Sequence, residues 1–218
     1  YRYGGAHGVR DPAGHQGVAM RIDLVRHGMT PGNEQRRYVG GSTDEGLSAK
    51  GRSLLRAICA DASDARVYSS TLKRTVQTAQ ILFPEAGIVP LRDLREMEFG
   101  SFEGKNADEL AEDASYRAWV DDGCVDACPG GESRSGFAAR CIRAFVDCVK
   151  REERFGVERT VLVVHGGTIM AILSELADPA IGYFEASIPP GGRWVCEWDG
   201  DRLTDVRRSV EGTAPCSR

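Results

Sequence analysis

Two short apolar segments stand out along the chain, and each is followed at once by polar residues that include a histidine. Ile22–Val25 is apolar at three of its four positions and is followed by Arg26 and His27. Val161–Val164 is apolar throughout and is followed by His165. Apolar runs of this length are typical of parallel strands that are covered on both faces. Because ligands bind at the carboxyl ends of such strands, the pattern predicts two imidazoles at one edge of a sheet.

The remaining apolar pattern predicts helices that alternate with short strands. The predicted helices begin after Ser48, after Ser69-Ser70-Thr71 and after Ser133 (ending near Glu153), with another at 168–173, and the further predicted strands are 66–68, 88–91, 193–198 and 202–206. The expected buried stripes are Leu54, Leu55 and Ile58 in the first helix and Leu72, Val76, Ala79 and Phe83 in the second. Ser and Thr before a helix accept hydrogen bonds from its first amides, which supports these starting points. The alternation predicts an α/β fold, a three-layer sandwich with a mainly parallel central sheet flanked by helices.

One domain accounts for most of the 218 residues. Residues 1–19 are rich in glycine and have neither a helical nor a strand period, so we expect a poorly ordered N-terminal tail there. The folded domain is expected at 20–211, and the end 212–218 is expected to be frayed. Residues of about 105–131 form the expected lid, with one or two short helices over the site. The lid carries seven carboxylates, most of them expected on a solvated helix face, together with Tyr116 and Trp119.

Composition and charge narrow the classes of function. The formal net charge of −4 gives no overall attraction to nucleic acid or to an anionic membrane. No apolar run is long enough to cross a bilayer. Cys124 and Cys128 have no second Cys or His pair at metal-ligand spacing, and Cys141 and Cys148 fall on the apolar side of the predicted long helix. This cysteine usage is typical of the reducing cytoplasm, and the sequence indicates no oligomeric state.

Two features supply donors for an anion. Residues 29–46 are expected to form a long loop, which in a compact domain usually has a function. Arg74 lies in the first turn of a predicted helix but outside its apolar stripe, where a cation is unfavourable unless an anion binds nearby. Two interpretations of Arg74 therefore stay open, an anion ligand and a solvated surface residue. The candidate donors in the loop are Thr30, Asn33, Arg36 and Arg37.

Two histidines, two arginines and a glutamate at one sheet edge are suited to the chemistry of phosphate monoesters. Arginine side chains match the oxygens of a phosphate dianion. A neutral imidazole can attack phosphorus and hold the phosphoryl group covalently. A second imidazole and a helix N-terminus can stabilise the equatorial oxygens, and a carboxylic acid can protonate the leaving oxygen. None of these steps requires a metal.

Motifs in a fixed order over about 20–206 carry a resemblance to a known family. They are Arg26-His27-Gly28 with Thr30 and Asn33, Gly40, Leu47-Ser48 with Gly51, Ser69 to Arg74 with Thr78-Ala79, Glu96 with Phe99-Gly100 and Glu103-Gly104, Gly130 to Ser133, and Val164 to Gly167. In this order and spacing the sequence resembles the histidine phosphatase superfamily, in its phosphoglycerate-mutase-like branch. The fold that the resemblance implies agrees with the apolar pattern.

The resemblance also implies roles for individual residues. His27 is the implied nucleophile, which forms a phosphohistidine, and Glu96 is the implied proton donor. Arg26, Arg74 and His165 are implied to hold the phosphoryl group. The further implied substrate-binding groups are Thr30, Asn33, Gly40 and the Gly166 amide. No metal and no cofactor is implied.

The sequence departs from the family pattern at two positions. Met29 stands where the family commonly has Glu, and Val164 stands where a small Ser is common before the second histidine. Neither change removes an implied catalytic group, but both alter the side chains that surround them.

Within the branch, the segment 94–104, the Tyr116/Trp119 pair and the length resemble the α-ribazole phosphatases of cobalamin synthesis. Phosphoglycerate mutases resemble the chain less, because they are longer and carry basic lid residues that hold the substrate carboxylate. We therefore expect a cytoplasmic phosphomonoesterase for a small phosphate ester, with α-ribazole 5′-phosphate as the candidate. The seven lid carboxylates are expected to disfavour a second anionic group on the substrate, and Tyr116 and Trp119 are expected to offer ring faces to a flat group. The alternatives are a mutase-type phosphotransferase and a catalytically silent domain that binds phosphorylated ligands. A silent relative is expected to have lost one of His27, Glu96 and His165.

Overall fold

The computed structural model describes residues 19–58 and 65–209. Residues 1–18 of the predicted tail 1–19, the last two residues of the predicted domain 20–211 and the predicted frayed end 212–218 lie outside the described residues. The strands are β1 (Met20–Arg26), β2 (Arg66–Ser69), β3 (Ile88–Pro90), β4 (Arg159–Val164), β5 (Arg193–Trp198) and β6 (Leu203–Arg208). The helices are α1 (Pro31–Glu34), α2 (Ala49–Arg56), α3 (Lys73–Leu82), α4 (Ala114–Asp121), α5 (Arg134–Arg154) and α6 (Gly166–Leu176), with short 3-10 turns η1 (Arg92–Leu94) and η2 (Gly100–Phe102).

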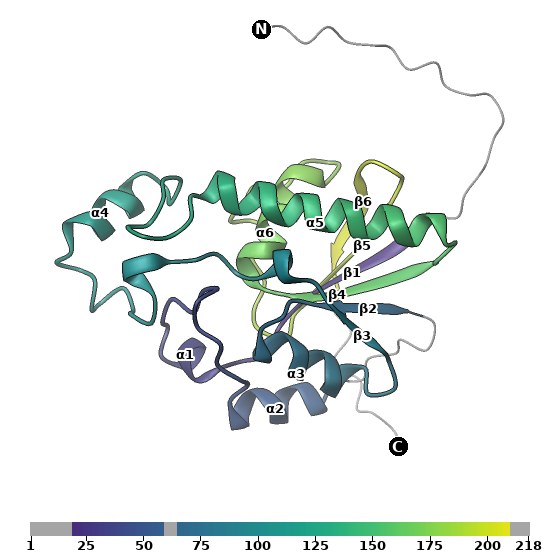
Figure 1. Cartoon of the computed structure of the whole chain (residues 1–218), viewed down its shortest axis with the longest axis horizontal. Helices are drawn as coiled ribbons and strands as arrows, with labels where there is room; N and C mark the ends of the chain where they lie inside the picture. Colours follow the sequence, from purple (N-terminus) through teal and green to yellow (C-terminus); the bar gives the residue numbers. More distant parts are fainter. Residues whose placement is uncertain (1–18, 59–64, 210–218) are drawn as a thin grey trace, which may run out of the picture.

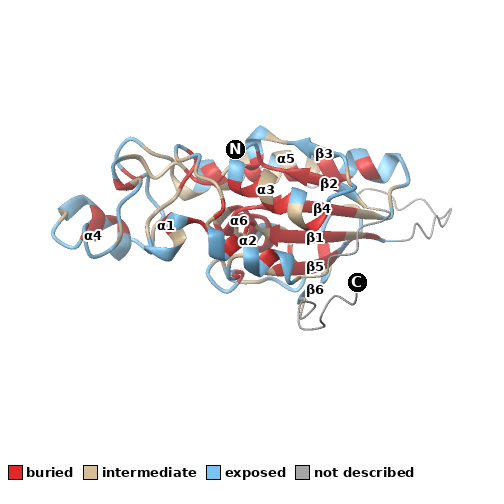
Figure 2. Cartoon of the chain, turned by 90° about the horizontal axis from the view of Figure 1, so that it is seen from below, coloured by how far each residue is buried: buried red, intermediate tan, exposed pale blue. Residues whose placement is uncertain are grey.

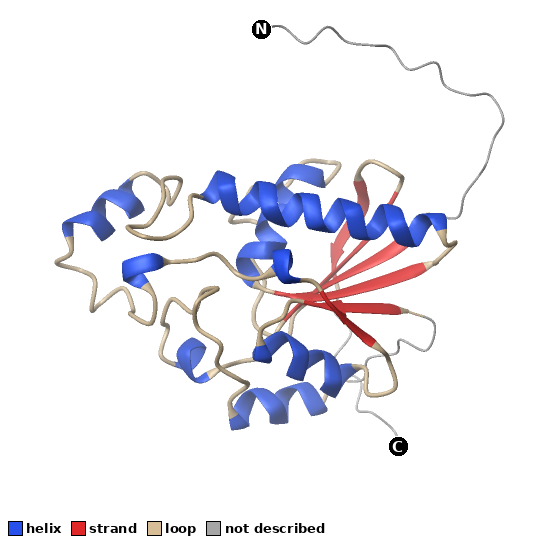
Figure 3. Ribbon diagram, viewed as in Figure 1, coloured by secondary structure: helices blue, strands red, loops and turns tan. Residues whose placement is uncertain are grey.

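The six strands form one sheet in the order β3-β2-β4-β1-β5-β6 (Figure 3). The pairs β3–β2, β2–β4 and β4–β1 are parallel, whereas β5 pairs antiparallel with β1 and with β6. The prediction of a mainly parallel sheet is therefore confirmed. The antiparallel pair β5–β6 extends the sheet beside β1, where its two strands are joined by a short turn.

Helices cover both faces of the sheet, with α5 and α6 on one face and α2 and α3 on the other (Figure 1). The central strands alternate accordingly: Ile22 and Leu24 of β1 pack in the α5/α6 core, and Val25 packs in the α2/α3 core. Leu162 and Val163 of β4 divide between the same two cores. Burial on both faces explains why these strands read as nearly continuous apolar runs, and Figure 2 shows them as the buried centre of the molecule.

A third apolar cluster joins the predicted lid to the rest of the domain. Phe102, Tyr116 and Trp119 pack there against Phe137 of α5, and each of these side chains is at least nine-tenths buried. Helix α4 is the one α-helix of 105–131, capped by Asp113, whose carboxylate accepts from the amides of Ser115 and Tyr116. The lid is therefore fixed by its own core and projects at the end of the molecule away from β6 (Figure 1).

Three local predictions are corrected by the structure. The predicted long loop 29–46 contains the short helix α1, which Thr30 caps. Leu54 does not belong to a buried stripe, because it is 52% exposed while Leu55 is 1% exposed. The hydroxyls of 69–71 do not cap α3, whose first amide, Lys73 N, instead donates to Asp44 Oδ1 at 2.7 Å. The cap comes from 29 residues upstream, and no local pattern marks it.

Candidate active site

The two histidines lie side by side at the carboxyl ends of β1 and β4. Arg26 pairs with Val164 in the parallel register, and the His27 amide donates to the Val164 carbonyl at 2.9 Å. The ring centroids of His27 and His165 are 5.2 Å apart, and both side chains are almost fully buried. Strand pairing alone therefore places the two imidazoles in contact, as the sequence predicts.

His27 is held in one tautomer with one nitrogen free. Its Nδ1 lies 2.7 Å from the Gly28 carbonyl, and because a carbonyl only accepts, Nδ1 carries the proton. Burial, with the charges of Arg74 and Arg26, lowers the pKa of His27 well below its usual value. The ring is therefore neutral near pH 7, and the lone pair on Nε2 is available at the pocket that His27 lines.

Arg26 brings an unpaired donor to the same place. Its Nη1 donates to the Ile188 carbonyl at 2.6 Å, whereas its Nε is buried without a hydrogen-bond partner in the described structure. A buried guanidinium donor without a partner is costly unless a ligand satisfies it. Gly166, the first residue of α6, allows this packing, because a Cβ there would lie 3.2 Å from Arg26 Cζ. The N-terminus of α6 and the guanidinium therefore face one small volume.

Arg74 is fully buried, so the interpretation of a solvated surface residue is wrong. Its Nη1 donates to the Thr43 carbonyl at 2.7 Å and its Nη2 to the Gly40 carbonyl at 3.0 Å. Its Nε donates to Nδ1 of His165 at 3.2 Å. The loop carbonyls and His165 thus hold the positive charge of Arg74 beside His27, and this charge lowers the pKa of His27.

Both ring nitrogens of His165 are engaged. Nδ1 accepts from Arg74, so the neutral ring carries its proton on Nε2 and donates it to Ser70 Oγ at 2.7 Å. Burial and the charge of Arg74 lower the pKa of His165 well below its usual value. In this arrangement His165 orients Arg74, and a direct contact with a phosphoryl oxygen requires one of the two bonds to be exchanged.

Thr30, Asn33 and Gly40 have different positions relative to the pocket. The Thr30 hydroxyl accepts from the Asn33 amide, and Asn33 Oδ1 accepts from the Thr30 amide. This capping box uses the oxygen of Asn33 and leaves its NH₂ group, which faces the pocket, as a donor. Gly40 lies behind the pocket wall: its amide donates to Glu103, and a Cβ would lie 2.3 Å from the Met97 carbonyl.

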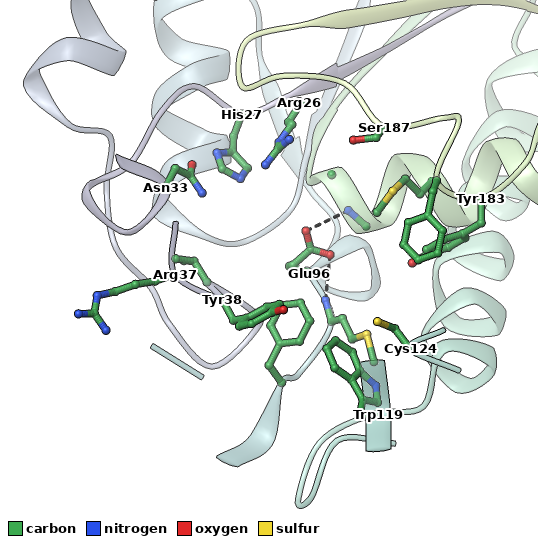
Figure 4. A pocket seen from close by; sticks show the side chains of 17 residues that line it. Arg26, His27, Asn33, Arg37, Tyr38, Glu96, Trp119, Cys124, Tyr183 and Ser187 are labelled. Atoms are coloured by element: carbon green, nitrogen blue, oxygen red, sulfur yellow. Dashed lines mark hydrogen bonds between the residues drawn. The ribbon is translucent and has the colours of Figure 1, made fainter. Parts of the chain in front are cut away.

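Glu96 faces the N-terminus of α6 (Figure 4). Its Oε2 accepts from the Gly167 amide and its Oε1 from the Met97 amide, both at 3.1 Å. Burial raises the pKa of Glu96 above its usual value, although the two amides and the charges of Arg74 and Arg26 oppose the shift. A carboxyl group with a raised pKa in a cleft is suited to donate a proton.

Some of these groups border one pocket of about 370 Å³. Of the predicted site residues, Arg26, His27, Asn33, Glu96 and Gly166 line it. The other four, Thr30, Gly40, Arg74 and His165, are buried and do not line it. The structure thus brings the predicted set together in two layers, an inner layer at the pocket and an outer layer that supports it.

The wall of the pocket away from His27 is largely apolar. Its larger side chains are Tyr38, Met97, Phe99, Trp119, Met170, Tyr183 and Phe184. Tyr38 and Tyr183 lie on opposite sides of Glu96 in Figure 4. Sequence reasoning missed Tyr183, Phe184 and Ser187, which follow α6 in a segment without apolar period. The adjacent aromatic pair was the one signal available there.

Tyr116, expected to offer a ring face to the ligand, does not line the pocket. It packs on Phe102 at 5.5 Å between ring centroids, and its hydroxyl lies 2.8 Å from that of Tyr38. Trp119 does line the pocket, with its Nε1 donating to the Asp126 carbonyl at 3.0 Å. Of the pair, Trp119 therefore lines the pocket, whereas Tyr116 contacts the lining residue Tyr38.

The seven lid carboxylates do not line the pocket either. They are Asp108, Glu109, Glu112, Asp113, Asp121, Asp122 and Asp126. Glu109 instead forms a two-bond ion pair with Arg37, at 2.7 and 2.8 Å. Arg37 lines the pocket, but its guanidinium points away from Arg26, His27 and Glu96 (Figure 4). The structure therefore gives no support to direct repulsion of a second anion by lid carboxylates at the pocket.

Neither a metal cluster nor a membrane span is found in the described part of the chain. No group of three or more His, Cys, Asp or Glu side chains in residues 19–58 and 65–209 is placed to hold a metal ion. Within the same residues, no helix has the length and apolar character of a membrane span.

Cys141 and Cys148 are buried in the core, as expected.

Comparison with known proteins gives consistent relatives. The profile of the histidine phosphatase superfamily (branch 1) matches residues 22–209. Probable phosphoglycerate mutase GpmB of Enterobacter sp. (strain 638) is 33% identical over 164 residues, which are 72% of this chain and 74% of that protein. The α-ribazole phosphatase from Shigella flexneri superposes with a TM-score of 0.77 at 22% identity, covering 91% of this chain and all of that one (100%). A phosphoglycerate mutase from Thermus thermophilus superposes with a TM-score of 0.67 at 30% identity, covering 88% and 99%.

Proposed function

Because the chain belongs to the histidine phosphatase superfamily (branch 1) and is an enzyme of the phosphatase or mutase type, we propose that it is a phosphomonoesterase that acts through a phosphohistidine on His27. The observation that carries this proposal is the convergence at one pocket of a neutral imidazole, an unpaired arginine donor and a carboxyl group of raised pKa. The complete set of His27, Glu96 and His165 speaks against a catalytically silent domain.

The proposed reaction has two steps. In the first, His27 Nε2 attacks phosphorus, the bond from phosphorus to the alcohol oxygen breaks, and Glu96 gives its proton to that oxygen. In the second, Glu96 takes a proton from water, whose oxygen attacks phosphorus, and the bond to Nε2 breaks. Arg26, Arg74 and the amino end of α6 counter the charge on the phosphoryl oxygens in both steps.

The pocket supports an alcohol group that is uncharged and partly apolar. Aromatic and Met side chains form most of its outer wall. The described residues that line the pocket include two cations, Arg26, which lies beside His27, and Arg37, which is paired with Glu109. A second acid group on the substrate would thus find no unpaired cation in that wall. A flat ring would bury apolar surface against Tyr38, Trp119 and Tyr183. We propose α-ribazole 5′-phosphate as a substrate of this kind.

A phosphoglycerate mutase-type phosphotransferase is the second candidate. Relatives at 30–33% identity carry that name, and this likeness extends beyond the fold. The two candidates differ in the charge of the group attached to the phosphate, which is why the outer wall of the pocket discriminates between them.

We expect α-ribazole 5′-phosphate to be hydrolysed with a higher kcat/KM than 3-phosphoglycerate. The physical reason is the apolar wall, together with the pairing of Arg37 by Glu109. Release of inorganic phosphate from both esters, measured side by side, tests this. A preference for 3-phosphoglycerate with transfer of phosphate between its hydroxyl groups would favour the mutase, and binding of both esters without turnover would favour a silent domain.

The pH profile of kcat/KM is expected to have its alkaline limb set by Glu96. The carboxyl must be protonated to donate, and burial raises its pKa above 4.5, so activity falls as pH rises through the raised value. His27 must be neutral, and its pKa lies below 6.5, so this group limits activity only at lower pH. The ratio of wild-type to Glu96→Gln activity, taken at each pH, cancels the ionisation of the substrate. This ratio should decline as pH rises, and a ratio independent of pH would contradict the role of Glu96.

A further inference from the structure

The proposed proton donor lies in a segment without regular secondary structure. Residues 95–99 connect η1 to η2 and contain neither helix nor strand. The carboxyl of Glu96 nevertheless fits closely against α6, because a Cβ on Gly167 would come within 2.3 Å of its Oε1. A donor must lie within hydrogen-bond reach of the leaving oxygen. Contacts from outside the segment must therefore fix its backbone.

Arg140, on α5, supplies the contacts at the beginning of this segment. Its Nη1 donates to the carbonyls of Asp93 and Arg95, at 2.9 and 3.0 Å, and its Nη2 lies 3.4 Å from the carbonyl of Glu96. The guanidinium itself lies over the ring of Phe137, 5.2 Å from the ring centroid. One side chain thus binds three carbonyls in a stretch of four residues that ends at the proposed proton donor.

Glu132 completes the arrangement from the other side. It accepts two bonds from Arg140, at 3.0 and 2.7 Å, and the two side chains are only 20% and 25% exposed. The same carboxylate accepts from the Glu98 amide at 3.0 Å, and the Glu132 amide donates to the Glu98 carbonyl at 2.9 Å. The pair of Arg140 and Glu132 therefore fixes the backbone both before and after Glu96.

We propose that the Arg140–Glu132 pair positions Glu96 for proton donation, a role that rests on the proposed phosphatase function. In the described structure neither residue of the pair is hydrogen-bonded to Arg26, His27, Arg74 or His165. Disturbing the pair thus displaces the donor and leaves the groups that bind the phosphoryl moiety in place. The consequence is a selective slowing of esters whose leaving oxygen needs a proton.

Arg140→Gln and Glu132→Gln test the proposal with two esters, an alkyl phosphate and nitrophenyl phosphate, whose leaving group needs little protonation. General acid catalysis contributes about 10²- to 10⁴-fold, so partial loss of positioning should lower kcat/KM for the alkyl ester by about tenfold to a hundredfold relative to nitrophenyl phosphate. The matched control is Arg143→Gln, an exposed arginine on the same helix, which should leave the ratio of the two esters unchanged.

A double variant separates positioning from a general structural effect. In a Glu96→Gln background the donor is absent, so adding Arg140→Gln should change the ratio no further. Thermal unfolding shows whether Arg140→Gln folds. If it does not, Arg140→Lys, which keeps the charge, and Glu132→Gln provide the test. Equal losses for both esters, or a further fall of the ratio in the double variant, would overturn the proposal. Wild-type protein inactive on both esters would instead contradict the proposed function.

Discussion

Replacing His27 by alanine is expected to abolish turnover, with a loss of about 10⁴-fold or more. His27 is the neutral imidazole with a free nitrogen at the pocket, whereas the second imidazole, His165, has both nitrogens engaged with Arg74 and Ser70. No second nucleophile of this kind therefore lines the pocket in the described structure. The variant should keep its fold, because the hydrogen bond that is lost joins His27 Nδ1 to the carbonyl of the adjacent Gly28 and does not link two elements of the fold.

The measurement is a denaturing alkaline quench of enzyme mixed with substrate that carries labelled phosphate. Wild-type protein should retain label that is lost on mild acid treatment, as expected of a phosphohistidine, and His27→Ala should retain none. His15→Ala, which removes an imidazole from the predicted N-terminal tail, is the matched control and should retain label. Label on His27→Ala at the wild-type level would assign the nucleophile elsewhere.

Replacing Arg74 by alanine is expected to raise the barrier of kcat/KM by on the order of 2–4 kcal/mol, which is about 30- to 1,000-fold. The guanidinium is buried beside both histidines and bonded to the carbonyls of Gly40 and Thr43. Its loss removes charge that would counter the phosphoryl group and leaves the carbonyls of Gly40 and Thr43 and Nδ1 of His165 without their donor. Binding, turnover and thermal stability should therefore all fall.

Inhibition by inorganic phosphate measures the binding contribution directly. Arg74→Ala should be inhibited more weakly than wild type, and Arg74→Lys should recover part of the difference. The control is Lys73→Ala, because Lys73 is the preceding cation on α3 but is 64% exposed and paired with Asp44. If phosphate inhibits Arg74→Ala as tightly as wild type, Arg74 has no role in holding the anion.

The acidic lid shows where sequence and structure diverge on substrate. Its composition suggested that carboxylates repel a second anionic group, yet the described lining of the pocket includes none of them. The proposed preference for an uncharged group therefore rests on other observations, the pairing of Arg37 with Glu109 and the aromatic wall. The direction of a side chain on a short helix depends on what packs beneath it, here Tyr116 and Trp119 on Phe102.

The sequence by itself determined the strands, the helices and the helix caps that depend on residues close together in the chain. Apolar runs buried on both faces specified β1 and β4, and because these strands pair in parallel, His27 and His165 had to meet at one edge. The spacing of apolar residues predicted α5, and Ser133 marked its beginning at Arg134. This cap could be predicted because Ser133 and the Gly136 amide that it binds lie within one turn.

Only the tertiary structure decided the features that depend on contacts between distant segments. Arg74 was equally compatible with a solvated position until the loop carbonyls of Gly40 and Thr43 and the ring of His165 enclosed it. Burial raises the pKa of Glu96, and the carboxyl lies against Gly167, which is 71 residues away and whose amide opposes the shift. A guanidinium or a carboxyl takes its charge state and direction from its surroundings, and those surroundings exist only once the chain has folded.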